Sequence, residues 1–227
     1  MGLQMHLQRL YVPAMAQGIK PSVDKPNLQA RIAELVKLNL PRETRIRLIL
    51  TKDDGSIYAG VQPFGPPSKE IYEKGVNVIS TELARQTPRV KYTEFISAST
   101  EQRKQVGENI YEILLVKNGK FLEGMTSNFY AVKGKRLITA RNGILLGVTR
   151  RSVLRLARGQ GMSIEYRSPQ VGEKFDEAFL TSSSRGVVPI ISIDHKKVGQ
   201  GKVGKWTKTL SKAYQAYVEE RSESLVD

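Results

Sequence analysis

The order of apolar patterns along this 227-residue chain predicts an α+β fold. Stretches with helical periodicity and stretches with strand periodicity are mixed, without the strict alternation that a doubly wound parallel sheet requires. A hydrophobic share of 40% and a charged share of 26% are typical of a globular protein with a sizeable core. Between Thr81 and Lys91 the pattern weakens around Pro88, which favours a connection between two lobes there. We therefore expect a smaller α/β lobe over residues 1–84, a hinge over 85–91 and a larger lobe over 92–227.

The first half of the chain contains patterns of both kinds. Leu3, Leu7 and Leu10 share one side of a helix, which Pro13 is expected to end. Asp24 is a typical residue at the start of a helix and precedes the next helical pattern. From Arg45 to Lys52 arginines alternate with apolar residues, which predicts a half-buried strand, and Asp53-Asp54-Gly55 predicts a turn after it. The predicted elements are a helix over 3–12, a helix over 24–39, a strand over 45–52, an irregular proline-rich stretch over 62–68 and a strand over 75–79.

The second half is richer in strands. The apolar run Ile113–Val116 predicts a buried strand, and the pair Asn118-Gly119 that follows it is a hairpin signal. Trp206, Leu210 and Tyr214 lie along one side of a final amphipathic helix. The predicted elements are a helix over 92–105, strands over 109–116, 128–132 and 136–139, a helix over 149–160, strands over 162–166, 176–182 and 187–193, and a helix from residue 205.

Several classes of protein are excluded or disfavoured by composition. The chain has no cysteine, so it has neither disulfides nor thiolate metal sites. Its two histidines, His6 and His195, make a histidine metal site improbable, and His195 is expected in a solvated turn. No apolar run approaches the roughly 20 residues that span a bilayer, and the N-terminus lacks the apolar core of a signal peptide. We expect a cytoplasmic protein without a membrane segment.

The net charge of +14 is unusual and indicates an anionic partner or simple solubility. Nucleic acid must be considered, because 36 lysines and arginines outnumber 22 acidic residues. The basic residues are dispersed, however, with local density only in 150–158 and 196–212, and no run interleaves them with aromatic residues. We therefore do not expect a nucleic-acid partner, while an anionic substrate or an anionic cofactor remains open.

The residues that could carry chemistry are a lysine, a carboxylate and hydroxyl groups. The chain has no phosphate loop, no G-x-G-x-x-G and no G-x-S-x-G motif. An enzyme that uses pyridoxal phosphate needs an amine, a carboxylate facing the pyridine nitrogen and donors around the phosphate. Glu123 follows a buried strand, Val148-Thr149 opens a helix, and Thr181–Ser184 is a cluster of hydroxyls after a strand. Each also has an ordinary alternative: Glu123 as a turn residue, Thr149 as a helix N-cap, and the serines as a plain loop.

Taken together and in order, these blocks resemble the fold-type IV aminotransferases, the class that includes branched-chain and D-amino-acid transaminases and aminodeoxychorismate lyase. The resemblance covers nearly the whole chain. It implies a two-lobed architecture whose larger lobe is a pseudo-barrel, pyridoxal 5'-phosphate as cofactor, an amino acid and a 2-oxo acid as substrates, and a homodimer. The matching blocks are His6-Leu7-Gln8-Arg9-Leu10, Val90-Lys91, Glu123-Gly124-Met125-Thr126-Ser127-Asn128, Leu145-Leu146-Gly147-Val148-Thr149-Arg150, Phe179–Ser184 and Gly201–Thr207.

The resemblance also implies a role for each matched residue. Lys91 is expected to be the Schiff-base lysine and to move the substrate's α-proton, and Glu123 to face the pyridine nitrogen. Neutralising an ordinary lysine at pH 7 costs roughly 4–5 kcal/mol, so burial of Lys91 in a dry pocket is expected. The residues expected to hold the phosphate are Arg9, Val148, Thr149 and Ser183. The others expected beside the cofactor are Leu145, against the ring, with Ser127, Asn128, Gly147 and Ser182.

The chain departs from the family pattern in three places. It starts at the helix of His6–Leu10, whereas the family has strands before it, so a shortened smaller lobe is expected. The family usually has an asparagine a few residues after the Schiff-base lysine. This chain has Tyr92-Thr93-Glu94-Phe95 there instead, which brings the acidic Glu94 near Lys91. No arginine–histidine pair follows strand 45–52, although Arg45 or Arg47 could bind the substrate carboxylate. A transaminase is the leading hypothesis. A lyase that uses the same lysine and a cofactor-free basic binding protein are the alternatives.

Overall fold

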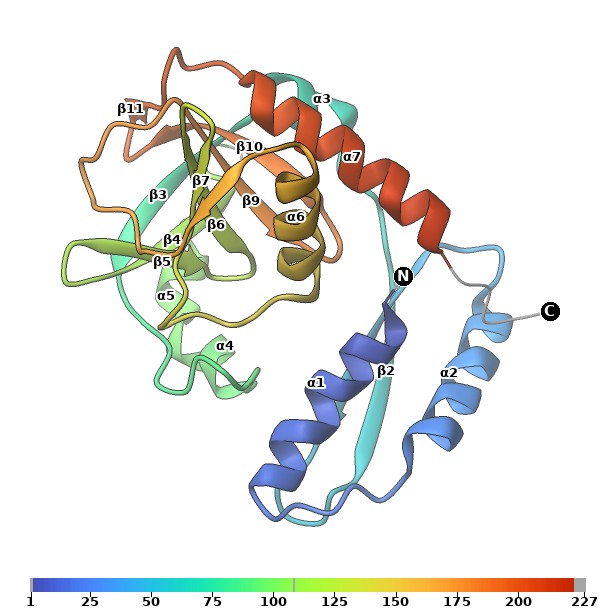
Figure 1. The fold of residues 1–227 in the computed structure, drawn as a ribbon. Coiled ribbons are helices and arrows are strands. Elements are labelled where there is room, and N and C mark those ends of the chain that lie inside the picture. The colour runs from blue at the N-terminus through green and yellow to red at the C-terminus, as the bar shows by residue number, and fades with distance from the viewer. Residues whose placement is uncertain (1, 108, 223–227) are drawn as a thin grey trace. The chain divides into compact units, whose positions relative to one another are not determined.

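The computed structural model describes residues 2–107 and 109–222 (Figure 1). Backbone contacts divide the chain into a larger unit, Pro67–Tyr217, and a smaller unit that runs to Pro66 and includes the chain from Val218. By these contacts the residues from 67 to 91 belong to the larger unit, because β3 (Val76–Glu82) pairs with two of its strands. The lobes 1–84 and 92–227 with a hinge at 85–91 remain a prediction about how the protein works.

The smaller unit consists of two helices and a two-stranded hairpin: α1 (Leu3–Ala16), α2 (Lys25–Asn39), β1 (Thr44–Leu50) and β2 (Ile57–Pro63). The strands are antiparallel, with Leu50 opposite Ile57, as the glycine turn between them predicted. Leu7, Tyr11 and Leu28 are buried between the helices and the hairpin. The predicted helix over 24–39 is confirmed, and the Asp24 carboxylate accepts a hydrogen bond from the Asn27 backbone N–H at its start.

One prediction in this half is wrong. Pro13 does not end the first helix, which continues to Ala16. A proline removes one backbone donor and crowds the carbonyl four residues earlier, but here Ala14 is buried beyond it and the side chain of Gln17 bonds the Pro13 carbonyl. The predicted irregular stretch is confirmed over 64–68, with β2 extending to Pro63 before it and a short helix that the sequence did not indicate, α3 (Lys69–Lys74), following it.

The larger unit is built on a nine-stranded sheet. β3 runs parallel to β4 and β10, whereas β9 is antiparallel to both β10 and β6. The strands β3, β4, β5, β6, β9 and β10 thereby form a closed ring, in which β9 joins the two sides. The strands after β3 are β4 (Glu112–Lys117), β5 (Lys120–Gly124), β6 (Asn128–Lys133), β7 (Arg136–Ile138), β8 (Ser163–Glu165), β9 (Glu177–Ser182), β10 (Gly186–Ile193) and β11 (Lys196–Lys197).

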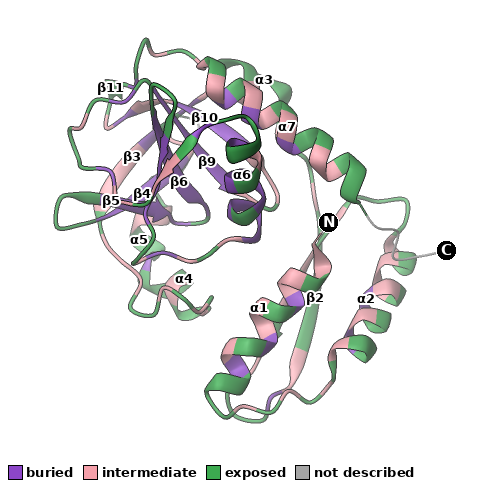
Figure 2. Ribbon diagram, in the orientation of Figure 1, coloured by how far each residue is buried: buried purple, intermediate pink, exposed green. Residues whose placement is uncertain are grey.

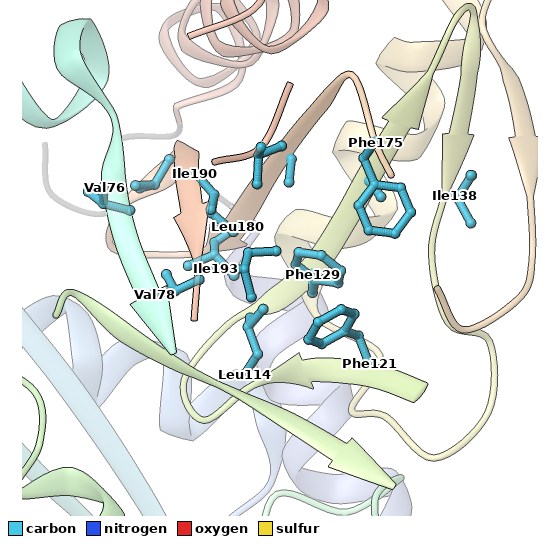
Figure 3. Packing of buried hydrophobic residues seen from close by; sticks show 14 of the residues in the cluster. Val76, Val78, Leu114, Phe121, Phe129, Ile138, Phe175, Leu180, Ile190 and Ile193 are labelled. Carbon is cyan, nitrogen blue, oxygen red and sulfur yellow. The ribbon is translucent and has the colours of Figure 1, made fainter. Parts of the chain in front are cut away.

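Apolar side chains fill the inside of this ring (Figure 3). Phe121 and Phe129 lie at its centre with their ring centroids 5.3 Å apart. Strand β4 is buried on both faces: Leu114 points into this cluster, and Ile113 and Leu115 belong to a second cluster on its other side. Burial on both faces explains why the strand reads as a continuous apolar run in the sequence.

Helices lie against the sheet of the larger unit, and the buried residues of α6 (Val148–Gly159) and α7 (Lys205–Arg221) are purple in Figure 2. Besides these two and α3, the larger unit contains the short helices α4 (Glu94–Ala98) and α5 (Thr100–Arg103), neither of which has a buried residue. The single helix expected over 92–105 is therefore wrong, because Ser99 interrupts it and its hydroxyl donates back to the Phe95 carbonyl. Within the described residues, no helix has the length and apolar character to cross a membrane.

Candidate active site

The Glu123 carboxylate lies at the end of β5 and is 2% exposed. Its Oε1 accepts a hydrogen bond from Arg85 Nε at 2.8 Å. Its Oε2 accepts from the Leu145 backbone N–H at 3.0 Å and from Asn128 Nδ2 at 3.3 Å. A carboxylate offers about four acceptor sites, so after these three bonds Oε1 can still accept one more. The reading of Glu123 as an ordinary turn residue is wrong, because it is a buried strand residue.

Burial is the largest influence on the protonation of Glu123. It raises the pKa of this carboxyl from 4.5 to about 7, although Arg85, the Leu145 N–H and Arg150 all act to lower it. At neutral pH the group therefore exchanges a proton readily and responds to any new charge placed beside it. A cation facing Oε1 would favour the ionised form, so the carboxyl is suited to bind a protonated heterocyclic nitrogen.

Asn128 and Leu145 hold the segment before α6 against this carboxylate. Asn128 Nδ2 donates to the Leu145 carbonyl at 2.8 Å as well as to Glu123. Gly147 passes so close to Asn128 that a Cβ at that position would lie 2.4 Å from Oδ1. Only a glycine leaves Asn128 in place, so the glycine of the Leu145–Arg150 block is required by the geometry of the site.

Replacing Gly147 with alanine is expected to destabilise the protein by about 1–3 kcal/mol, because the new methyl group displaces Asn128 and loosens its bonds to Glu123 and Leu145. The measurement is the free energy of unfolding in denaturant. Gly159→Ala, in α6 itself, is the matched control, since a Cβ there meets nothing within 4 Å, and it should leave stability unchanged or slightly raised. Equal stabilities for the two variants would contradict this account of Gly147.

Lys91 lies in the loop between β3 and α4, and its side chain is exposed. The expected burial of this lysine is therefore wrong for the single chain. The loop is anchored on both sides, however. Before Lys91, Arg85 bonds Glu123; after it, Phe95 stacks against the same arginine, whose Cζ lies 3.8 Å from the ring centroid. Arg89 donates to the Arg141 carbonyl at 2.9 Å. Both ends of the loop that carries Lys91 therefore contact Arg85, the arginine that bonds Glu123.

The start of α6 supplies backbone donors next to this cluster. Gly147 is the N-cap residue, and no side chain caps the helix. Thr149 is therefore not the N-cap; its buried hydroxyl lies 3.4 Å from that of Tyr214. The first-turn N–H groups, including those of Val148 and Thr149, have no carbonyl partner within the helix, and the helix dipole favours an anion there.

The hydroxyl cluster after β9 forms the turn into β10. Thr181 lies opposite Asn128 in the pairing of β9 with β6, so the cluster starts beside the Glu123 site. Ser182 is half-buried and Ser183 is exposed in the turn. The hydroxyl of Ser127 is directed elsewhere, since it donates to Glu112 Oε2 at 3.3 Å. The Ser127 hydroxyl is therefore bonded to Glu112 and not to Glu123.

Arg9 belongs to the smaller unit. It is half-buried in α1, where its Nη2 lies 3.3 Å from His6 Nδ1, and burial lowers the pKa of its guanidinium. Its role toward a phosphate stays a prediction. Arg45 and Arg47 are exposed on β1, and Glu94 is exposed at the start of α4.

Three residues at the site were not foreseen. Arg85 bonds Glu123, while Glu112 and Arg185 form a second ion pair at 2.9 Å. Glu112 carried a usable signal, because a carboxylate at the head of an apolar run is buried and needs a partner. Arg85 and Arg185 lie in loops, where no periodicity marks a buried cation. No group of three or more metal-ligating side chains occurs in the described part of the chain.

The fold and the site together define a ring-centred α+β protein in which a buried carboxylate, a helix start and a hydroxyl turn meet at neighbouring strand ends. The chain belongs to the class IV aminotransferases: the family model described as "Amino-transferase class IV" matches residues 1–193. This confirms the predicted family.

Individual relatives and a solved structure agree with this assignment. The chain is 29% identical over 230 residues to a D-alanine aminotransferase of Bacillus licheniformis, covering 94% of this chain and 81% of the relative. It is 32% identical over 187 residues to a probable branched-chain-amino-acid aminotransferase of Thermotoga maritima, covering 78% and 67%. The branched-chain amino acid aminotransferase of T.th., solved with pyridoxamine 5'-phosphate, has the same fold, with a TM-score of 0.86 over 98% of this chain and 81% of that chain at 22% identity. The predicted fold class is confirmed.

Proposed function

We propose that this protein is a pyridoxal-phosphate-dependent transaminase that moves an amino group between an amino acid and a 2-oxo acid, with Lys91 as its Schiff-base lysine. The observation that carries the proposal is the Glu123 carboxylate. It is 2% exposed, retains an acceptor site and has a pKa raised to about 7. Burying a carboxylate costs stability; Arg85 offsets part of that cost, and a protonated pyridine nitrogen is a partner that fits the acceptor site left on Oε1.

The residues around Glu123 suit the rest of this cofactor. Gly147 and Gly124 let Asn128 and Ser127 pack closely beside the carboxylate, since a Cβ at either position would collide with one of these side chains. The uncapped start of α6, with Val148 and Thr149, offers donors to a phosphate dianion. The side chain of Leu145 extends from a backbone that is fixed to Glu123, next to where a ring would lie.

Each residue has a defined task in the proposed reaction. When bound, pyridoxal phosphate supplies an electron sink that makes bonds at the substrate's α-carbon easier to break. Glu123 would keep a proton at the pyridine nitrogen, and the Lys91 amine would hold the cofactor by its aldehyde group and, once displaced, carry the α-proton. The first turn of α6, Ser182 and Ser183 would neutralise and orient the phosphate, and Leu145 would pack on the ring.

The substrate class rests on the relatives. Those compared above are named for D-alanine and for branched-chain amino acids. We propose that the substrates are a small or aliphatic amino acid and a 2-oxo acid, with the handedness of the amino acid left to the assay.

A homodimer is also proposed. Large apolar side chains are exposed along the smaller unit, including Met15 at 64%, Leu38 at 81% and Tyr58 at 62%. Several large apolar side chains exposed on one small unit support an interface with a second copy of the chain.

Reductive trapping tests the cofactor assignment. Purified protein is titrated with pyridoxal phosphate, reduced with borohydride and digested, and the modified peptide is identified by mass spectrometry. We expect a visible absorption band, a single modified lysine at Lys91, and twice the 25.4 kDa chain mass in light scattering of the loaded protein. A band absent at saturating cofactor, or a label spread over surface lysines, would overturn the proposal. Pyruvate release without amino transfer would indicate a lyase instead.

A further inference from the structure

A buried ion pair outside the Glu123 cluster joins two turns of the site. Arg185, in the turn between β9 and β10, donates through Nη2 to Glu112 Oε2 at 2.9 Å. The two side chains are 18% and 3% exposed. Arg185 also lies over the ring of Tyr111, 5.3 Å from its centroid, and the Tyr72 hydroxyl bonds its backbone carbonyl. The guanidinium is therefore fixed from several sides.

The same guanidinium contacts a hydroxyl in each turn. Its Nη2 donates to Thr126 Oγ1, in the turn between β5 and β6, and its Nε donates to Ser182 Oγ at 3.1 Å. Ser182 belongs to the turn proposed to bind the phosphate. Arginine suits this task because its planar fork presents several donors in fixed directions.

These contacts set the direction in which each hydroxyl donates. Thr126 and Ser127 both give their protons to Glu112 Oε2, so neither can donate to a ligand. Ser182 is different, because it accepts from Arg185. A hydroxyl has one proton and two lone pairs, so a lone pair filled by the guanidinium leaves the Ser182 proton directed away from Arg185 and available to an acceptor.

We propose that Arg185, held by Glu112, is a positioning residue that sets Ser182 as a hydrogen-bond donor to the phosphate of the cofactor and so selects a phosphorylated ligand over its unphosphorylated form. This rests on the proposed function. Arg185 acts through Ser182, and Glu112 keeps the guanidinium in place.

The test compares pyridoxal phosphate with pyridoxal, which lacks only the phosphate. Dissociation constants for both are measured by absorption titration in the wild type, Ser182→Ala, Arg185→Lys and the double variant Arg185→Gln/Glu112→Gln. The double variant neutralises both charges, so no isolated charge is left buried. Arg167→Gln/Glu173→Gln is the matched control, because this pair also forms a direct ion pair, at 2.6 Å, in the larger unit but lies away from the two turns.

We expect the preference for pyridoxal phosphate over pyridoxal to fall about tenfold or more in Ser182→Ala, Arg185→Lys and the double variant, as for one hydrogen bond lost to a charged group. Affinity for pyridoxal should stay unchanged, and adding Ser182→Ala to the double variant should cause no further loss. The control should keep the wild-type preference. Equal weakening of both ligands, or an unchanged preference, overturns the role of Arg185 while the proposed function stands. A wild type that binds neither ligand overturns both.

Discussion

Lys91→Ala is expected to lower kcat/KM for transamination by at least about 10³-fold, because it removes both the amine that binds the cofactor and the base that moves the α-proton. Lys91 lies in an exposed loop, so its loss should not change the folded structure. The melting temperature of the variant should accordingly match that of the wild type. The measurement is the initial rate of amino transfer from D-alanine and from L-leucine to 2-oxoglutarate.

The matched control is Lys104→Ala. This lysine is also exposed, at the end of α5, where it pairs with Glu101 on the surface at 2.7 Å. Its loss should leave kcat/KM unchanged, since surface pairs contribute little to stability. If Lys91→Ala retained a tenth of the wild-type rate, Lys91 would not be the residue that performs the chemistry.

Glu123→Gln is expected to lower kcat by about 10²–10³-fold, the usual cost of losing one electrostatic partner of the reacting system. Glutamine has nearly the same shape but cannot carry the negative charge that holds a proton at the pyridine nitrogen. Cofactor binding should persist, because the phosphate donors and Lys91 are untouched. Rates are measured at saturating cofactor, and a kcat within threefold of the wild type would contradict the assigned role.

The same variant reports on the pKa of Glu123. Burial raises this pKa to about 7 in the folded protein from 4.5. Between these values the folded state keeps a proton that the unfolded state has lost, so the free energy of unfolding falls as pH rises, by at most about 3 kcal/mol once pH exceeds the folded pKa. Below the lower value the effect vanishes. In cofactor-free protein, Glu123→Gln should remove this dependence of unfolding free energy on pH between about pH 5 and about pH 8. An identical dependence in the wild type and the variant would contradict the raised pKa of Glu123.

Patterns that depend on one face of an element were predicted well. The alternation in β1, the apolar run of β4 and the turn at Asn118-Gly119 follow from local geometry, and the strands lie where expected. What failed depends on tertiary contacts. Pro13 is carried inside a helix because its neighbours are buried, and the helix expected over 92–105 is broken by the backward hydrogen bond of Ser99.

The sequence blocks that form the site were predicted, but the arginines that pair with its carboxylates were not. Glu123, Asn128, Leu145 and Gly147 are joined by contacts in the structure, as expected for one site. The counter-ions were not foreseen, because Arg85 is 38 residues from Glu123 and Arg185 is 73 residues from Glu112. Loop arginines leave no periodic trace, so only the folded chain reveals which carboxylate each one neutralises.

Because β9 closes the ring of strands, the turns of this protein can change in evolution while the strands stay in place. Every strand of the ring bonds to neighbours on both sides, so none of these strands offers a free edge to another chain. Their alignment is set by those ladders rather than by the turns that link them. Exposed turn positions such as Ser183 can thus accept new side chains, and with them a new ligand, without shifting the strands that carry them.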